Sequence, residues 1–146
     1  MHLTTLTIFT FVMVTVAIPH RRQTTEQSVQ LIFHGGPVQY SWGLLANGTL
    51  QSTGNDLIVD TIDAPNYNAL QNCQFITDND KTLVGAFSST GVPQITVGPP
   101  QPIRAVSCQG VCIPTFGDCF RDGQSLGTCC AGFCAANKCR SFSGSG

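Results

Sequence analysis

Hydrophobic and polar residues alternate along most of the chain between residues 29 and 108. Val29, Leu31 and Phe33 occupy every second position of one segment, and residues 38–44 repeat the pattern. A period of two is typical of a β-strand with one buried face. No stretch of ten residues after the N-terminal segment shows the 3.6-residue period of a helix. The pattern predicts seven or eight short strands, with candidates at 29–33, 38–44, 49–53, 57–62, 72–77, 82–88, 92–97 and 103–108.

Turn-forming residues separate these segments. Asn47-Gly48 is a hairpin dipeptide because both residues tolerate positive φ, so residues 49–53 are expected to return antiparallel to the preceding strand. Asp78-Asn79-Asp80 is similar to the start of a calcium loop. A polar hairpin tip is favoured there, because Thr82 and Leu83 stand where a ligand and a glycine are needed.

Two further breaks are expected from composition. Residues 64–68 predict an irregular corner or a single helical turn, and residues 98–102 contain three prolines between the last two strand candidates. Strands with a turn about every ten residues indicate an all-β sandwich or barrel, here called the β-domain, residues 23–108. Its expected large core side chains are Phe33, Trp42, Phe75 and Phe87.

Six cysteines lie between Cys112 and Cys139, with the pair Cys129-Cys130 in the middle. A segment this short cannot bury enough apolar surface to fold by its core alone, so disulfides are expected to stabilise it. The spacing, the run 127–134 and the closing residues 138–140 resemble the knottin (inhibitor cystine knot) family. The resemblance implies a knot module over residues 109–141, followed by a flexible tail at 142–146. It also implies the pairs Cys112–Cys130, Cys119–Cys134 and Cys129–Cys139.

Cys73 and Cys108 are then left to link the β-domain. In the chain-entropy model, closing that loop stabilises the fold by about 4 kcal/mol. A rival pairing puts Cys108 into the knot and leaves Cys73 free or intermolecular. Zinc binding is disfavoured by the vicinal pair and by the lack of a nearby histidine. Because only residues 109–111 join Cys108 to Cys112, we expect the two modules to be rigidly coupled.

The N-terminus predicts export. An apolar run within residues 1–17 ends in small residues that suit signal-peptidase cleavage after Ala17. Arg21-Arg22 resembles a kexin-type processing site, which implies a pro-segment at 18–22; an ordinary exposed arginine pair is the alternative. Residues 31–108 also resemble the β-rich small secreted proteins of filamentous fungi, through 33–36, 67–73 and 97–108. Secretion implies an oxidising compartment.

Candidate chemistry is sparse. The net charge is −1 and only 10% of residues are charged, so no basic field exists to hold nucleic acid. His34 is expected to be structural or solvated, and nothing in the spacing of Asp60 and Asp63 requires a glycosidase pair. Asn47-Gly48-Thr49 is a glycosylation sequon in an expected exposed turn. We therefore expect no catalysis, no metal and no cofactor.

The knot module carries more aromatic and basic side chains than its small core can bury. Aromatic residues and arginine are enriched at binding hot spots, so a binding surface is expected here; the alternative is that the aromatics pack onto the β-domain. The candidates are Phe116, Phe120, Arg121, Phe133, Lys138 and Arg140.

These features predict a secreted, monomeric, non-enzymatic protein, effector- or toxin-like, that binds an extracellular protein or glycan through its knot loops. Two alternatives remain open. One is a chitin- or glucan-binding wall protein, and the other is a protease inhibitor anchored by Arg121. No membrane span is expected in the mature chain.

Overall fold

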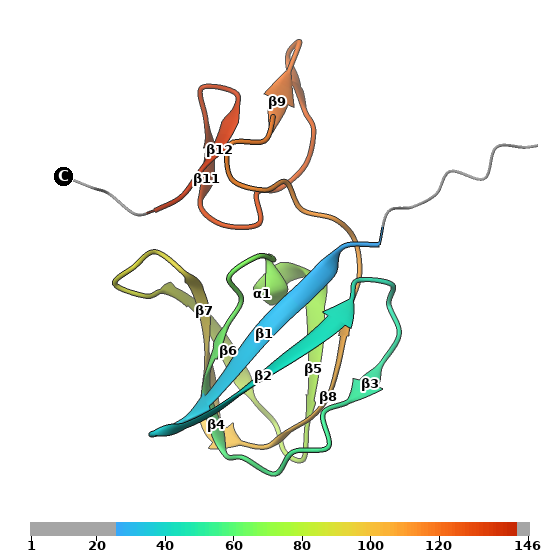
Figure 1. Cartoon of the computed structure of the whole chain (residues 1–146), viewed down its shortest axis with the longest axis vertical. Helices are drawn as coiled ribbons and strands as arrows, with labels where there is room; N and C mark the ends of the chain where they lie inside the picture. The colour runs from blue at the N-terminus through green and yellow to red at the C-terminus, as the bar shows by residue number, and fades with distance from the viewer. Residues whose placement is uncertain (1–25, 143–146) are drawn as a thin grey trace, which may run out of the picture.

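The computed structural model describes residues 26–142, which form antiparallel β-sheets and one turn of helix (Figure 1). The expected signal peptide with Ala17, the Arg21-Arg22 pair and residues 143–146 of the expected tail lie outside the described residues. The all-β fold class is confirmed. The larger sheet has the order β2-β1-β4-β7-β6, from β1 (Ser28–Gly35), β2 (Val38–Leu45), β4 (Val59–Asp63), β6 (Thr82–Phe87) and β7 (Pro93–Gln101).

A second sheet completes the β-domain. Its order is β3-β8-β5, from β3 (Gln51–Ser52), β5 (Cys73–Thr77) and β8 (Ile103–Cys108). The helical turn α1 (Ala69–Asn72) follows the corner at residues 64–68. The knot module contains two small hairpins, β9 (Phe120–Arg121) with β10 (Gln124–Ser125) and β11 (Phe133–Ala135) with β12 (Lys138–Arg140). It lies beyond the end of the sheets at which α1 lies (Figure 1).

The two sheets share one hydrophobic core. Period-two alternation in β1 buries Val29, Leu31 and Phe33 completely. They belong to the same buried cluster as Phe75 of β5 and Val106 of β8. Burying a side chain of this size contributes roughly 1.5–3 kcal/mol, so the alternating face of β1 fixes how this strand sits in the sandwich.

Two expected hairpins are wrong. β3 pairs with β8, through Gln51↔Val106, rather than returning along β2. The Asn47-Gly48 turn instead carries the chain from one sheet to the other, and the Gly48 amide donates to the Cys108 carbonyl at 2.8 Å. Residues 78–80 likewise connect β5 of the smaller sheet to β6 of the larger one. Sheet pairing is a long-range choice, and the turn dipeptide alone does not determine it.

The proline-rich stretch is also not a complete break, because β7 continues through Pro99 and Pro100 to Gln101. β6 pairs with β7 only as far as Gly98, and the β4 ladder is irregular between Val59 and Thr61. The two prolines therefore stand where neither neighbouring ladder is regular, which is where a strand tolerates proline.

The expected core side chains are confirmed in part. Phe33 and Phe75 are buried, whereas Trp42 is half-buried at the edge of the core. The prediction that Phe87 is a core residue is wrong, since 46% of its surface is exposed. The largest fully buried side chain is Tyr67, which lies in the corner before α1. Sequence alternation missed it because it belongs to no strand.

Candidate functional site

Four disulfides join all eight cysteines. Cys73 pairs with Cys108 across neighbouring strands β5 and β8. The other six pair in the order that the knottin resemblance implied, and the rival pairing through Cys108 is wrong. The knot pairs are Cys112–Cys130, Cys119–Cys134 and Cys129–Cys139.

The sulfur atoms form most of the knot interior. Cys119, Cys129 and Cys139 are buried together, with Ile113 packed against them. Their sulfur atoms lie within 4.8 Å of one another. Each of these sulfurs is already bonded to another sulfur, so none is the free thiolate that a metal would require. The closeness is that of packed disulfides.

One face of the β11–β12 hairpin carries Cys134 and Cys139, and the opposite face points to solvent. Phe133 stands opposite Arg140 in the ladder, and Ala135 stands opposite Lys138. Residues directly opposite in an antiparallel pair project to the same face. Because Cys139 alternates with its neighbours and points into the interior, Lys138 and Arg140 point outward with Phe133.

Phe116 joins this outward face. Its backbone is left-handed, with φ of 68°, which is unusual for a bulky residue. The Phe116 amide donates to the Cys139 carbonyl at 2.8 Å, so β12 holds the residue in place. The ring is 67% exposed, and the Arg140 guanidinium lies 5.8 Å from its centre, within the range of a cation–π contact.

A carboxylate links the remaining basic residues. Asp118 accepts from Lys138 Nζ at 2.5 Å and from Arg121 Nη2 at 2.9 Å. The hydrogen bond from Lys138 makes the larger contribution and that from Arg121 the smaller, and together they hold the pKa of Asp118 below its usual value. The ion pairs therefore tie the β9–β10 hairpin to β12.

The structure thus brings five of the six expected binding residues into one connected surface, here called the knot face: Phe116, Arg121, Phe133, Lys138 and Arg140. Phe120 is exposed but makes no aromatic contact with any ring in residues 26–142. The strand β9 that contains Phe120 leads into the Asp122-Gly123 turn. Both turn residues have positive φ, as a tight two-residue hairpin requires.

The alternative that the aromatics pack onto the β-domain holds in part. Phe142, expected to begin a flexible tail, lies between the two modules. Its ring centre is 5.2 Å from that of Phe133 and 4.3 Å from that of Phe87 in β6. Phe133 nevertheless remains 46% exposed. One edge of the knot face therefore continues into an aromatic contact with the β-domain.

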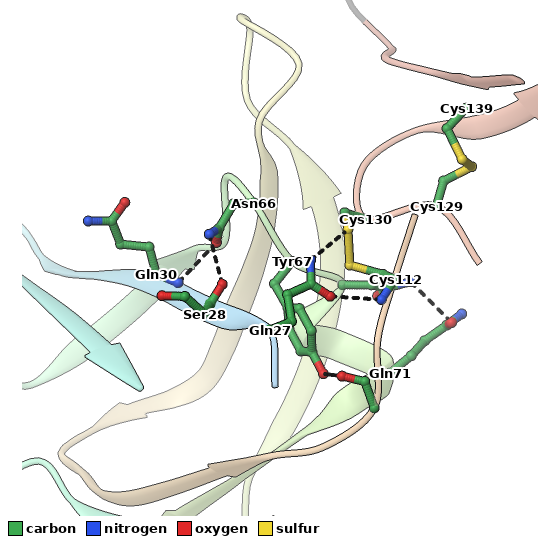
Figure 2. The surroundings of a disulfide bond; sticks show 12 residues. Gln27, Ser28, Gln30, Asn66, Tyr67, Gln71, Cys112, Cys129, Cys130 and Cys139 are labelled. Atoms are coloured by element: carbon green, nitrogen blue, oxygen red, sulfur yellow. Dashed lines mark hydrogen bonds between the residues drawn. A yellow bond between two sulfur atoms is a disulfide. The ribbon is translucent and has the colours of Figure 1, made fainter. Parts of the chain in front are cut away.

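The modules are also joined around the Cys112–Cys130 bridge (Figure 2). The Gln27 side chain accepts from the Cys112 amide at 2.9 Å and donates to the Cys130 sulfur at 3.4 Å. The Tyr67 hydroxyl lies 2.9 Å from the Gln109 carbonyl and 3.0 Å from that of Gly110. Neither Gln27 nor Tyr67 was expected from sequence, because their partners lie 42 to 103 residues away.

The other candidate residues have structural partners. His34 contacts Asp63 at 2.9 Å, and the second oxygen of Asp63 accepts from Gln94 at 2.7 Å. Asp60 accepts from the Gly36 amide. Asp60 and Asp63 therefore bond to different partners, and neither contact involves the other carboxylate. Asp78 pairs with Arg104, which holds the pKa of Asp78 below its usual value.

Asn47 is exposed at the turn between the sheets, where its side chain accepts from the Thr49 amide at 3.0 Å. Among the residues that the structure describes, no helix is both long and apolar enough to cross a membrane. Comparisons with protein-family models, with curated proteins and with solved structures found no match.

Proposed function

We propose that this chain is a secreted binding protein, effector- or toxin-like, whose C-terminal module is a knottin and whose knot face contacts an extracellular protein or glycan. Four disulfides in a β-rich chain fit an oxidising, extracellular environment. The expected signal peptide, the Arg21-Arg22 processing site and a fungal-type origin belong to the same proposal.

The observation that carries this proposal is the stack of Arg140 on Phe116. Arg140 makes no ion pair with any carboxylate in residues 26–142. Its guanidinium therefore remains available to a carboxylate or aromatic group of a partner. Disulfides and the Cys139 hydrogen bond fix the backbone beneath both residues, which lowers the entropy lost on binding. An exposed aromatic beside an unpaired arginine is typical of a binding hot spot.

We infer that the protein acts by binding rather than by catalysis. The His34–Asp63 pair is the one histidine–carboxylate contact in residues 26–142. No hydroxyl or thiol there hydrogen-bonds to His34, so this pair lacks the nucleophile of a triad. The protease-inhibitor alternative receives less support, because Asp118 holds the Arg121 guanidinium and a tight turn follows directly.

The proposal is tested by single substitutions in the knot face. Labelled wild-type protein, Phe116→Ala and Arg140→Ala are compared on arrays of extracellular proteins and wall polysaccharides. Val38→Ala is the matched control, since Val38 is 56% exposed on β2 in the β-domain. Loss of a hot-spot side chain weakens binding by about tenfold or more. A ligand that wild type, control and both knot variants bind equally would refute the knot face as the contact surface.

A further inference from the structure

A hollow of about 340 Å³ lies between the β-domain and the knot module. It is bordered by the segment 64–71, by β6 and β7, and by Gly132 and Phe142 on the knot side. This volume is near the lower end of the range for small-molecule sites, and junctions between modules are frequent positions for such sites. The hollow therefore has the size for one small ring compound rather than an extended chain.

A glycine in β6 leaves the space open. Gly85 stands opposite Ile95 in the ladder and so faces the same side as that buried residue. A Cβ at position 85 would stand only 2.7 Å from the Leu70 side-chain tip. The floor of the hollow is therefore bare backbone beside Leu70, and a larger residue would push Leu70 or occupy the space itself.

Two phenylalanine rings form an apolar wall. Phe87 and Phe142 lie with their centres 4.3 Å apart and their planes tilted by 47°. Each remains about half exposed, at 46% and 48%. Phe87 is not a core residue because it lies on the inner face of the larger sheet where the sandwich ends.

The polar part of the lining is neutral. Asn68 Nδ2 donates to Gln71 Oε1 at 3.1 Å, which leaves Asn68 Oδ1 as an acceptor and Gln71 Nε2 as a donor. Gln94 also lines the hollow, and no residue around it is charged. A charged ligand would find no counter-ion here, and a wholly apolar ligand would cover the carboxamides without bonding to them, which is unfavourable.

We propose that this hollow binds one unit of a neutral pyranose sugar. Such a ring has an apolar C–H face that packs on aromatic side chains, and hydroxyl or acetamido groups that bond to carboxamides. A larger hollow of about 490 Å³ is formed by residues 76–81 alone and has no aromatic wall, so it lacks this combination. The proposal does not rest on the knot face, because it uses different residues, apart from the contact of Phe133 with Phe142.

The test measures binding of two neutral trisaccharides, one of N-acetylglucosamine and one of β-linked glucose, to the intact disulfide-bonded protein by NMR titration. Gly85→Val should abolish binding. Gly43→Val is the matched control, since its added Cβ would meet nothing closer than 3.8 Å in β2. Phe142→Ala is the second variant and removes a wall without filling the space, so it should weaken binding about fivefold.

Binding of either sugar by wild type and Gly43→Val, with the loss in Gly85→Val, supports the inference and identifies which sugar is preferred. If Gly85→Val does not fold, the weakening in Phe142→Ala carries the test. No binding of either sugar at millimolar concentration overturns it. Binding that survives both substitutions in folded protein also overturns it, because the sugar would then bind elsewhere. Phe116→Ala should leave sugar binding unchanged, which separates this result from the knot-face test.

Discussion

The two tyrosines of this protein offer a direct test of how the knot is attached to the β-domain. The Tyr67 hydroxyl lies within hydrogen-bonding distance of the carbonyls of Gln109 and Gly110, in the three-residue joint between the modules. The Tyr40 hydroxyl is buried near the Thr53 side chain but makes no hydrogen bond of good geometry in residues 26–142. Phenylalanine at either position keeps the ring and removes only the oxygen.

The expected changes in free energy of unfolding differ between the two sites. A protein hydrogen bond contributes about 1 kcal/mol net, so Tyr67→Phe should lower the free energy of unfolding by about that amount. For a chain of this size the loss corresponds to a fall in Tm of roughly 3 °C. Burial raises the pKa of Tyr67, so its hydroxyl remains a donor at neutral pH. Tyr40→Phe removes a buried hydroxyl that has only a poorly aligned contact with Thr53, so it should lower the free energy of unfolding by much less than Tyr67→Phe.

Denaturant unfolding under non-reducing conditions measures both changes, and ¹⁵N relaxation reports the mobility of residues 112–140 relative to the β-domain. Tyr67→Phe should increase that relative mobility, whereas Tyr40→Phe should not. The reasoning is refuted if Tyr67→Phe has wild-type stability, or if Tyr40→Phe costs as much. Large relaxation differences between the modules in the wild type would contradict rigid coupling itself.

Three further predictions concern the joint, the knot and the sequon. Gln27→Ala removes both contacts to the Cys112–Cys130 bridge and should cost about 1 kcal/mol, whereas Gln27→Glu keeps the acceptor for the Cys112 amide and should cost less; chemical denaturation ranks them, and the reverse order would contradict the assigned contacts. The pKa of Asp118 is lower in the folded state, so its ion pairs stabilise the fold fully above about pH 4 and less as the pH falls through the folded-state pKa. Asp118→Asn should therefore have a lower Tm than wild type at pH 7 but not at pH 2, and a Tm gap that persists at pH 2 would refute the ion-pair role. Secreted protein should lose the mass of one glycan on Asn47→Gln, and an unchanged mass would show the sequon is unoccupied.

The sequence predicted strands better than it predicted their partners. Alternation is a local property, so Val29, Leu31 and Phe33 identified β1 and its buried face. Pairing depends on contacts between distant residues, so the Asn47-Gly48 turn gave the wrong neighbour for β3. The cysteine spacing carried more information, because its resemblance to a known framework implied all three pairs of the knot.

The candidate site was predictable by composition but not by arrangement. Counting aromatic and basic side chains in a segment with little core identified the knot face. The stack of Arg140 on Phe116 depends on the left-handed backbone at Phe116, and no local sequence motif predicts that conformation. The hollow at Gly85 could not be predicted from the sequence either, because it requires β6 to meet Phe142, which follows the knot module in the chain.

The central claim is that three interlocked disulfides hold the C-terminal module as a rigid binding platform. It is tested most directly by mapping the disulfides of the secreted protein by mass spectrometry after proteolysis without reduction. The account predicts the pairs Cys112–Cys130, Cys119–Cys134 and Cys129–Cys139, together with Cys73–Cys108. Free thiols, or a bridge from Cys108 into the knot, would contradict it.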